Sequence, residues 1–137
     1  MGVFKRLGLV LLFLIVVAAG ISVTKRFLEV KKSPPIDRSK IRVRVFNGSG
    51  VKYQGRRTAM FLRSLGFDVW DIYDTKEGFK NTMVIEHTDP SLLNAKEVAK
   101  AIHYKRKIIK ELDSLLYIDV TVIVGKDYKK FFPDTGL

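Results

Sequence analysis

Hydrophobic positions follow two different patterns along the chain, a single long run near the start and short alternating segments after residue 40. Residues 7–23 contain no charged side chain, and two basic residues stand on each side of them. This length is at the lower limit for a helix that spans a bilayer. We predict a transmembrane signal-anchor helix over residues 7–23, in contact with the lipid bilayer, behind a basic head at residues 1–6. A cleaved signal peptide is the alternative, although its apolar core would be shorter.

The segment that follows, residues 24–40, is charged and contains Ser33, Pro34 and Pro35. Prolines stiffen a chain and remove backbone donors. We therefore predict a basic linker here, followed by a folded domain over residues 41–128. The remaining residues, 129–137, are predicted to form a loose tail.

Alternation with a period of two predicts the strands of this domain. Ile41, Val43 and Val45 alternate with Arg42 and Arg44, which is typical of a half-buried strand. The same reasoning predicts further strands over the ranges 67–73, 82–87 and 117–124, with a short one at 107–110.

Two segments have the spacing of helices. Residues 54–65 form the first, and Gly66 is a natural place for it to end. Asp89 and Pro90 provide an N-cap and a first helical position for the second. One face of this second helix is apolar, with Leu92, Ala95, Val98, Ala99 and Ile102.

The predicted order β-α-β-β-α-β points to an α+β two-layer sandwich of the ferredoxin-like, or split βαβ, type. In that plan two helices cover one face of a four-stranded, largely antiparallel sheet. A small doubly wound α/β sheet is the alternative, but two helices are too few to cover two faces. Arg42 and Arg44 should lie on the helix-free face, with Asp119 and Thr121 as neighbours.

A glycine turn separates the first predicted strand from the first helix. Helix N-termini after such turns can bind phosphate groups. A dinucleotide fingerprint would need a third glycine where Tyr53 stands, and no Walker sequence is present, so we expect no cofactor. An anion can still bind the first helical amides, helped by Lys52, Arg56 and Arg57. The candidate residues for binding an anion or polymer are Asn47, Gly48, Ser49, Gly50, Lys52, Arg56, Arg42 and Arg44.

Composition argues against several other functions. The chain has no cysteine, and its histidines, His87 and His103, stand far apart, so we expect no metal site. Ser49 has no nucleophile-elbow pattern and no predicted histidine neighbour, so we expect no enzyme. Residues 1–40 hold eight Lys or Arg and two Asp or Glu, hence +6 of the net charge of +11. This charge flanks the apolar run, where it affects membrane topology. We predict no nucleic-acid partner, because the first and last strands lack outward aromatic pairs.

Three sequence blocks resemble the LytR C-terminal domain family. They are Val43-x-Val45-Phe46-Asn47-Gly48-Ser49-Gly50-Val51, Leu65-Gly66-Phe67-x-Val69, and the closing run from Asp119 to Tyr128. In that family the domain often follows a LytR-CpsA-Psr catalytic domain, which attaches anionic polymers to the bacterial cell wall. The present chain leaves no room for that catalytic domain, so the resemblance implies a stand-alone accessory domain without catalytic residues. It also implies a position outside the cytoplasmic membrane.

Together these features predict a non-enzymatic, single-pass protein of the bacterial cell envelope. Its extracytoplasmic C-terminal domain would bind an anionic wall polymer or a wall-assembly partner of the LytR-CpsA-Psr type. The alternative is a regulatory domain that binds an anion or nucleotide through residues 47–50.

Overall fold

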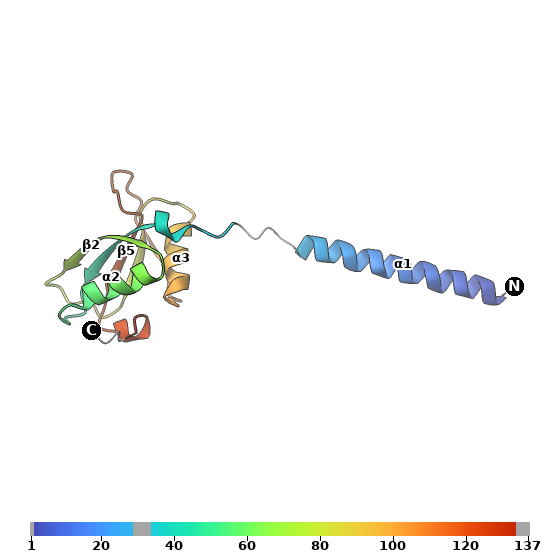
Figure 1. Ribbon diagram of the computed structural model, residues 1–137, viewed down its shortest axis with the longest axis horizontal. Coiled ribbons are helices and arrows are strands. Elements are labelled where there is room, and N and C mark those ends of the chain that lie inside the picture. The colour runs from blue at the N-terminus through green and yellow to red at the C-terminus, as the bar shows by residue number, and fades with distance from the viewer. Residues whose placement is uncertain (1, 29–33, 134–137) are drawn as a thin grey trace. The chain divides into compact units, whose positions relative to one another are not determined.

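The computed structural model describes residues 2–28 and 34–133, which belong to two separate units (Figure 1). The first unit is one helix, α1 (Gly2–Leu28). Its segment Gly2–Ser22 is long and apolar enough to cross a membrane, with a mean hydropathy of 2.3, and none of it is buried against protein. A membrane anchor and a signal sequence both have this length and composition. The predicted apolar run at residues 7–23 lies within α1, whereas linker residues 29–33 lie outside the described residues.

The second unit is built on a five-stranded sheet with the order β2-β1-β5-β3-β4. Two helices, α2 (Gln54–Ser64) and α3 (Leu93–Ala101), pack against it. Two 3₁₀ turns, η1 (Arg38–Lys40) and η2 (Tyr128–Lys130), precede and follow the sheet in sequence. The strands are β1 (Arg42–Asn47), β2 (Asp68–Asp74), β3 (Met83–Glu86), β4 (Ile109–Lys110) and β5 (Val120–Val124).

Both helices cover the same face of the sheet. α2 packs on β1 and β2, and α3 packs on β3 and β5. Leu62 of α2 and Val98 of α3 share one buried cluster with Val45 and Val122, which are central side chains of the sheet. Alternate residues of β1 supply this cluster, because successive side chains of a strand point to opposite faces. The predicted α+β class is therefore confirmed.

The strand order differs from the ferredoxin-like plan. β1 pairs in parallel with both β2 and β5, β3 pairs in parallel with β4, and β3 and β5 are antiparallel. In a split βαβ unit another strand would separate β1 from β2, but here α2 returns the chain to the strand position next to β1. The largely antiparallel, four-stranded arrangement is therefore wrong. The doubly wound alternative does not fit either, because the second face carries neither α2 nor α3.

The boundaries of two elements also differ from the predictions. α3 begins at Leu93, because Asp89 and Pro90 belong to a separate turn in which the Asp89 carbonyl accepts a hydrogen bond from Leu92 N. The Asp89 carboxylate accepts a bond from Leu93 N at 3.0 Å, so it still serves the helix start. β5 begins at Val120 instead of residue 117. Gly66 ends α2 as predicted, with a left-handed φ of +95°.

The described part of the predicted tail is packed against the domain. Phe132 is only 2% exposed and belongs to the core cluster. The ring of Phe131 lies 5.5 Å from that of Tyr104, between ring centres. Residues 129–133 therefore close one side of the core, and residues 134–137 lie outside the described residues.

Candidate functional site

The glycine turn after β1 uses its polar side chains internally. Asn47 Nδ2 donates to the Val51 carbonyl at 3.0 Å and to the Asp74 carboxylate at 2.7 Å. Asn47 Oδ1 accepts a bond from Ser49 Oγ at 2.6 Å, and Ser49 Oγ accepts one from Val51 N at 3.1 Å. Asn47 and Ser49 are both buried. These bonds fix the turn, and they leave the two side chains poorly placed to bind a ligand.

Gly48 and Gly50 are required for different reasons. A Cβ atom at Gly48 would lie 2.3 Å from the ring of Phe79, so the loop after β2 occupies the space of a side chain. Gly50 has a φ of +77°, which L-residues with side chains rarely adopt. The turn therefore brings the chain from β1 to α2 at close packing, as its predicted geometric role requires.

A cavity of about 240 Å³ lies beside this turn, but its charge does not suit an anion. Lys52 is on its wall, and so is the carboxylate of Asp74. Two negative groups at contact distance repel each other by about 1 kcal/mol even in water. For an anion bound at the turn, repulsion from the Asp74 carboxylate would therefore cancel much of the attraction to the Lys52 ammonium.

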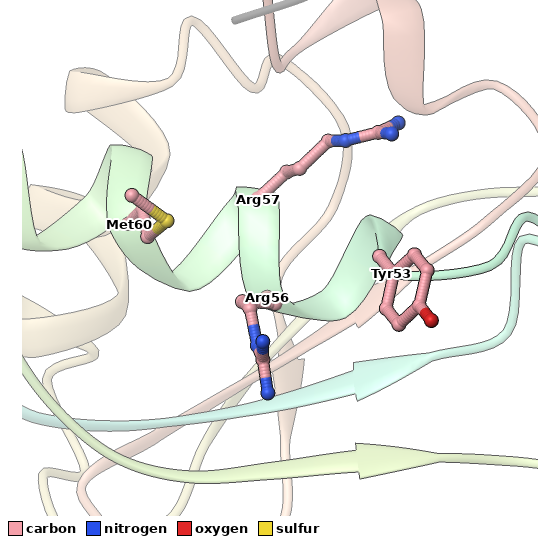
Figure 2. Close-up of a pocket in the computed structure, with 4 residues that line it drawn as sticks. All are labelled: Tyr53, Arg56, Arg57 and Met60. Carbon is pink, nitrogen blue, oxygen red and sulfur yellow. The ribbon is translucent and has the colours of Figure 1, made fainter. Parts of the chain in front are cut away.

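The start of α2 has the opposite character. Arg56 and Arg57 line a second cavity of about 290 Å³ with Tyr53 and Met60, and Figure 2 shows the two guanidinium groups extending from opposite sides of the helix. Among residues 34–133, no carboxylate lies within ion-pair distance of Arg56, Arg57 or Lys52. The first turn of α2 contains no acidic residue and has no side-chain cap. Cations at the positive end of a helix are unfavourable by some tenths of a kcal/mol each, and a bound anion removes that cost.

Arg42 and Arg44 lie on the helix-free face, as predicted, and so apart from the cations of α2. Arg42 makes a bidentate ion pair with Asp119, with nitrogen–oxygen distances of 2.9 and 3.0 Å. Arg44 pairs with Asp71 at 3.2 Å. The two arginines are therefore neutralised within the fold, and their charge is less available to a ligand than that of Arg56.

An aromatic pair on the same face was missed at the sequence level. The rings of Phe46 and Tyr73 stack with their centres 5.3 Å apart, and the Arg44 guanidinium lies 6.0 and 5.9 Å from them. Phe46 has the same strand parity as Arg44, which was the available signal. Its partner could not be read from the sequence, because it lies on β2, which the predicted topology did not place beside β1.

Glu86 is a second residue that the sequence analysis missed. Its side chain is 0% exposed and accepts hydrogen bonds from Ala95 N at 2.8 Å, Asp89 N at 3.0 Å and Thr88 N at 3.2 Å. Its place on the core parity of β3, together with Val84, was the available signal. The carboxylate caps the first turn of α3 from the sheet, so its role is structural.

The closing run of the family blocks is also structural. Asp127 Oδ1 accepts bonds from Thr82 N at 2.7 Å and Thr82 Oγ1 at 2.8 Å, and Arg106 forms an ion pair with Asp127. Burial raises the pKa of the Asp127 carboxyl, but the bonds from Thr82 and the Arg106 contacts outweigh it, so the pKa lies below its ordinary value. Gly125 N donates to Thr82 Oγ1, which closes β5 onto the start of β3.

The described residues contain no group of three side chains that could hold a metal ion. His87 is buried, with Nδ1 2.9 Å from the Glu111 carbonyl and Nε2 2.8 Å from Thr121 Oγ1. Both ring nitrogens are therefore engaged within the fold. His103 lies on an exposed turn after α3.

The fold resembles that of a secreted protein of known structure. The crystal structure of the soluble domain of a conserved hypothetical secreted protein from Mycobacterium marinum matches with a TM-score of 0.54 and 17% identity. The match covers 71% of the present chain and 66% of the other, which is slightly less than two thirds of its length. This likeness concerns the fold alone. No curated protein matches the chain significantly.

A family model described as "LytR cell envelope-related transcriptional attenuator" matches residues 40–128, which is more than half of the chain. The match spans the sheet from β1 to β5 and includes both the glycine turn and the closing run. It confirms the resemblance seen in the sequence and indicates a cell-envelope context, and the family is one of non-catalytic accessory domains. The chain therefore belongs to the LytR C-terminal domain family.

Proposed function

We propose that this chain is a membrane-anchored, non-enzymatic envelope protein whose extracytoplasmic domain binds an anionic wall polymer or a wall-assembly partner. The family supplies the cell-envelope context. α1 has the length and hydropathy of an anchor. The observation that carries the proposal is a group of cations at the start of α2 that have no carboxylate partner among residues 34–133, which we name the α2 basic surface: Lys52, Arg56 and Arg57. Arg56 and Arg57 line one cavity with Tyr53, and the Lys52 ammonium lies 4.8 Å from the centre of the Tyr53 ring.

Local chemistry favours an extended anion over a small enclosed ligand. The two guanidinium groups point in different directions from the helix (Figure 2), which favours a ligand with several separated charges over a single small anion. A polymer with repeated phosphate or carboxylate groups can contact each of them. Tyr53, which is 55% exposed, lines the same cavity as Arg56, and the Lys52 ammonium lies 4.8 Å from its ring centre, so a polymer unit beside the ring would meet the Lys52 charge as well.

A binding experiment with the domain tests this assignment. The core cluster lies entirely within residues 41–132, so a fragment of residues 36–137 retains it. We expect this domain to co-sediment with purified anionic wall polymer, and binding to weaken as salt is added. The double variant Arg56→Gln/Arg57→Gln should bind about tenfold more weakly, since ionic contacts at the exposed Arg56 and the half-buried Arg57 contribute about 0.5–1 kcal/mol each.

The control removes two other exposed cations, in the variant Lys100→Gln/Lys129→Gln. It has the same net charge as the test variant, and both residues are exposed and lie outside the α2 basic surface. Equal loss in the two variants would show non-specific charge attraction and would refute the assignment. If the unmodified domain binds neither the polymer nor any envelope protein, the proposed function is wrong.

The anchoring part of the proposal needs its own experiment. Fusions of alkaline phosphatase and of a fluorescent protein after Leu137 report which side of the membrane the domain occupies. We expect phosphatase activity and a membrane-bound product that keeps residues 1–22. A fluorescent cytoplasmic fusion would refute the extracytoplasmic position, and a soluble product shortened at its N-terminus would identify a cleaved signal.

A further inference from the structure

The loop between β4 and β5, which we name the apolar loop (residues 111–119), exposes several large apolar side chains. Leu115 is 87% exposed, Tyr117 75% and Leu112 48%. Isolated exposed apolar residues are common on protein surfaces, but clustered ones usually mark contact with a partner or a membrane. The loop leads into β5 and stands away from the sheet (Figure 1).

The apolar loop has an ordered base that holds these side chains outward. Asp113 N donates to the His87 carbonyl at 2.9 Å, next to the end of β3. The Asp113 carboxylate accepts a bond from Leu115 N at 2.9 Å, and its carbonyl accepts one from Leu116 N at 3.2 Å. Ile118 is buried at the other end of the loop. The exposed tip is thus part of the fold.

This loop lies at the end of the domain where the chain arrives from the linker. β1 and β5 run in parallel, and Val43 is paired with Val120, so both strands begin at this end of the sheet. Asp119 N donates to the Arg42 carbonyl and Arg42 N donates to the Asp119 carboxylate, both at 2.9 Å. The last residue of the apolar loop is therefore bonded to the first residue of β1.

Two more exposed apolar side chains lie at the same end. β3 ends there, because Glu86 is paired with Val120, and α3 starts shortly afterwards with the exposed Leu93. Ile36, which is also exposed, precedes η1 in the segment that enters β1. Apolar exposure is thus spread over this end of the domain.

We propose that this end of the domain docks on the lipid surface of the membrane, with Leu115 and Tyr117 inserted at the interface. The proposal rests on the membrane anchoring proposed for α1. Twelve residues, 24–35, join the apolar run to Ile36, and even fully extended they reach only roughly 40 Å. A tether of this length keeps a second site at a high effective concentration, so a small apolar contact is enough. Tyrosine is favoured at the headgroup level, with leucine deeper.

The charges around the loop indicate apolar rather than ionic docking. Glu111 and Asp113 are exposed near the tip, Lys110 precedes them, and the exposed Lys40 of η1 at the same end pairs with Asp37 at 3.8 Å. Acidic side chains do not favour anionic headgroups. Docking should therefore occur on zwitterionic lipid and should change little with salt, unlike polymer binding at the α2 basic surface.

Site-specific fluorescence quenching tests the proposal with the full chain. The sequence has no cysteine, so Leu115→Cys gives a unique site for a small fluorophore. The labelled chain is placed in phosphatidylcholine nanodiscs that contain lipids with a quencher on the acyl chain. We expect several-fold stronger quenching at residue 115 than in a matched Lys126→Cys control, which labels an exposed position after the opposite end of β5.

A second variant guards against an effect of the label. Tyr117→Ser in the Leu115→Cys background should reduce the quenching, since it removes an exposed apolar ring without touching the core. Equal quenching at residues 115 and 126, or none at 115, overturns the proposal. The proposal is also overturned if the label at residue 115 is shielded in detergent micelles without lipid, and only when a second copy of the chain is present. Polymer co-sedimentation is measured separately, so failure of the lipid contact is distinguishable from failure of the proposed function.

Discussion

The substitution Glu86→Gln is the sharpest test of how this domain is held together. The Glu86 carboxylate is fully buried, and it accepts bonds from Ala95 N, Asp89 N and Thr88 N. Glutamine has nearly the same shape, so it creates no cavity. It replaces one acceptor oxygen by an amide that donates, and one of the three backbone donors loses its partner.

Two opposing effects decide the result. A buried N–H without an acceptor costs about 1–3 kcal/mol, and the bonds that remain lose their charge-assisted strength, worth about 1 kcal/mol more. Removing the charge also removes the cost of burying it, which favours glutamine. Because the carboxylate is surrounded by donors at 2.8–3.2 Å, we expect the lost bonds to dominate. The free energy of unfolding should fall by about 2–4 kcal/mol, and the melting temperature by roughly 10–20 °C.

Urea unfolding of residues 36–137 measures this difference, with circular dichroism and the fluorescence of the single tryptophan, Trp70, as two probes. Glu111→Gln is the matched control, since its side chain is exposed, and it should change the unfolding free energy by less than about 0.5 kcal/mol. If the two variants are equally stable, or if Glu86→Gln is the more stable one, the capping argument is refuted.

Three further outcomes follow from the structure. Gly125→Ala should lower the free energy of unfolding by about 3 kcal/mol or more, because its Cβ would lie 2.3 Å from the backbone carbon of Asn81. Gly78→Ala is the control, since the nearest atom to its Cβ would be 3.9 Å away, and it should leave the unfolding free energy nearly unchanged in the same urea titration. Phe132→Ala should lower the free energy of unfolding by about 3–5 kcal/mol, whereas Lys129→Ala, at an exposed position, should leave it nearly unchanged. Equal stability of the two variants would mean that the C-terminal segment is not part of the core. Stability should fall with acid below about pH 4, because the pKa values of Asp119 and Asp127 are lower in the folded state; Asp119→Asn should flatten that part of the pH profile.

The sign of the acid effect follows from the folded environment of each group. Burial raises the pKa of Asp119, but hydrogen bonds from the Arg42 side chain and backbone and from Thr88, with the Arg42 charge, lower it more. A group with a lowered folded pKa stabilises the fold above its unfolded pKa and loses that contribution as the pH falls through the folded value. The measurement is the unfolding free energy between pH 7 and pH 2. A flat profile would contradict the ion pair of Asp119 with Arg42.

The elements were predictable, but their pairing was not. Alternation placed β1 and the core parity of Val43 and Val45 correctly, since period two reports which side chains face inward. It does not report which strand lies alongside. Val120 to Val124 alternates in the sequence, yet Thr121 is also buried, because β5 lies between β1 and β3. Only the strand order reveals this, and it depends on long-range packing.

The candidate site was predictable as a set of charges but not as a place. Arg42, Arg44, Lys52 and Arg56 were all identified, yet the sequence could not show that the first two have carboxylate partners on other strands. Asp71 is 27 positions away from Arg44 and Asp119 is 77 away from Arg42. The sequence likewise could not show that Asn47 and Ser49 bond to each other. The structure separates these residues from Lys52 and Arg56, which have no carboxylate partner among residues 34–133.

The residues by which the family is recognised mostly build the frame of the domain. Asn47 and Gly48 pack the turn against Val51 and Phe79, and Asp127 ties the end of β5 to Thr82. Side chains that already make these contacts within the fold are not available to bind a ligand. The side chains that can contact a ligand lie on the α2 basic surface and the apolar loop. Arg56 and Arg57 of the first and Leu115 of the second are outside the blocks that carry the family resemblance. Family membership therefore predicts the fold of this chain, whereas its ligand must be sought at these exposed positions. Exchanging the α2 basic surface for neutral residues should weaken binding and change the free energy of unfolding by only some tenths of a kcal/mol, whereas exchanging Gly125 should mainly lower the free energy of unfolding.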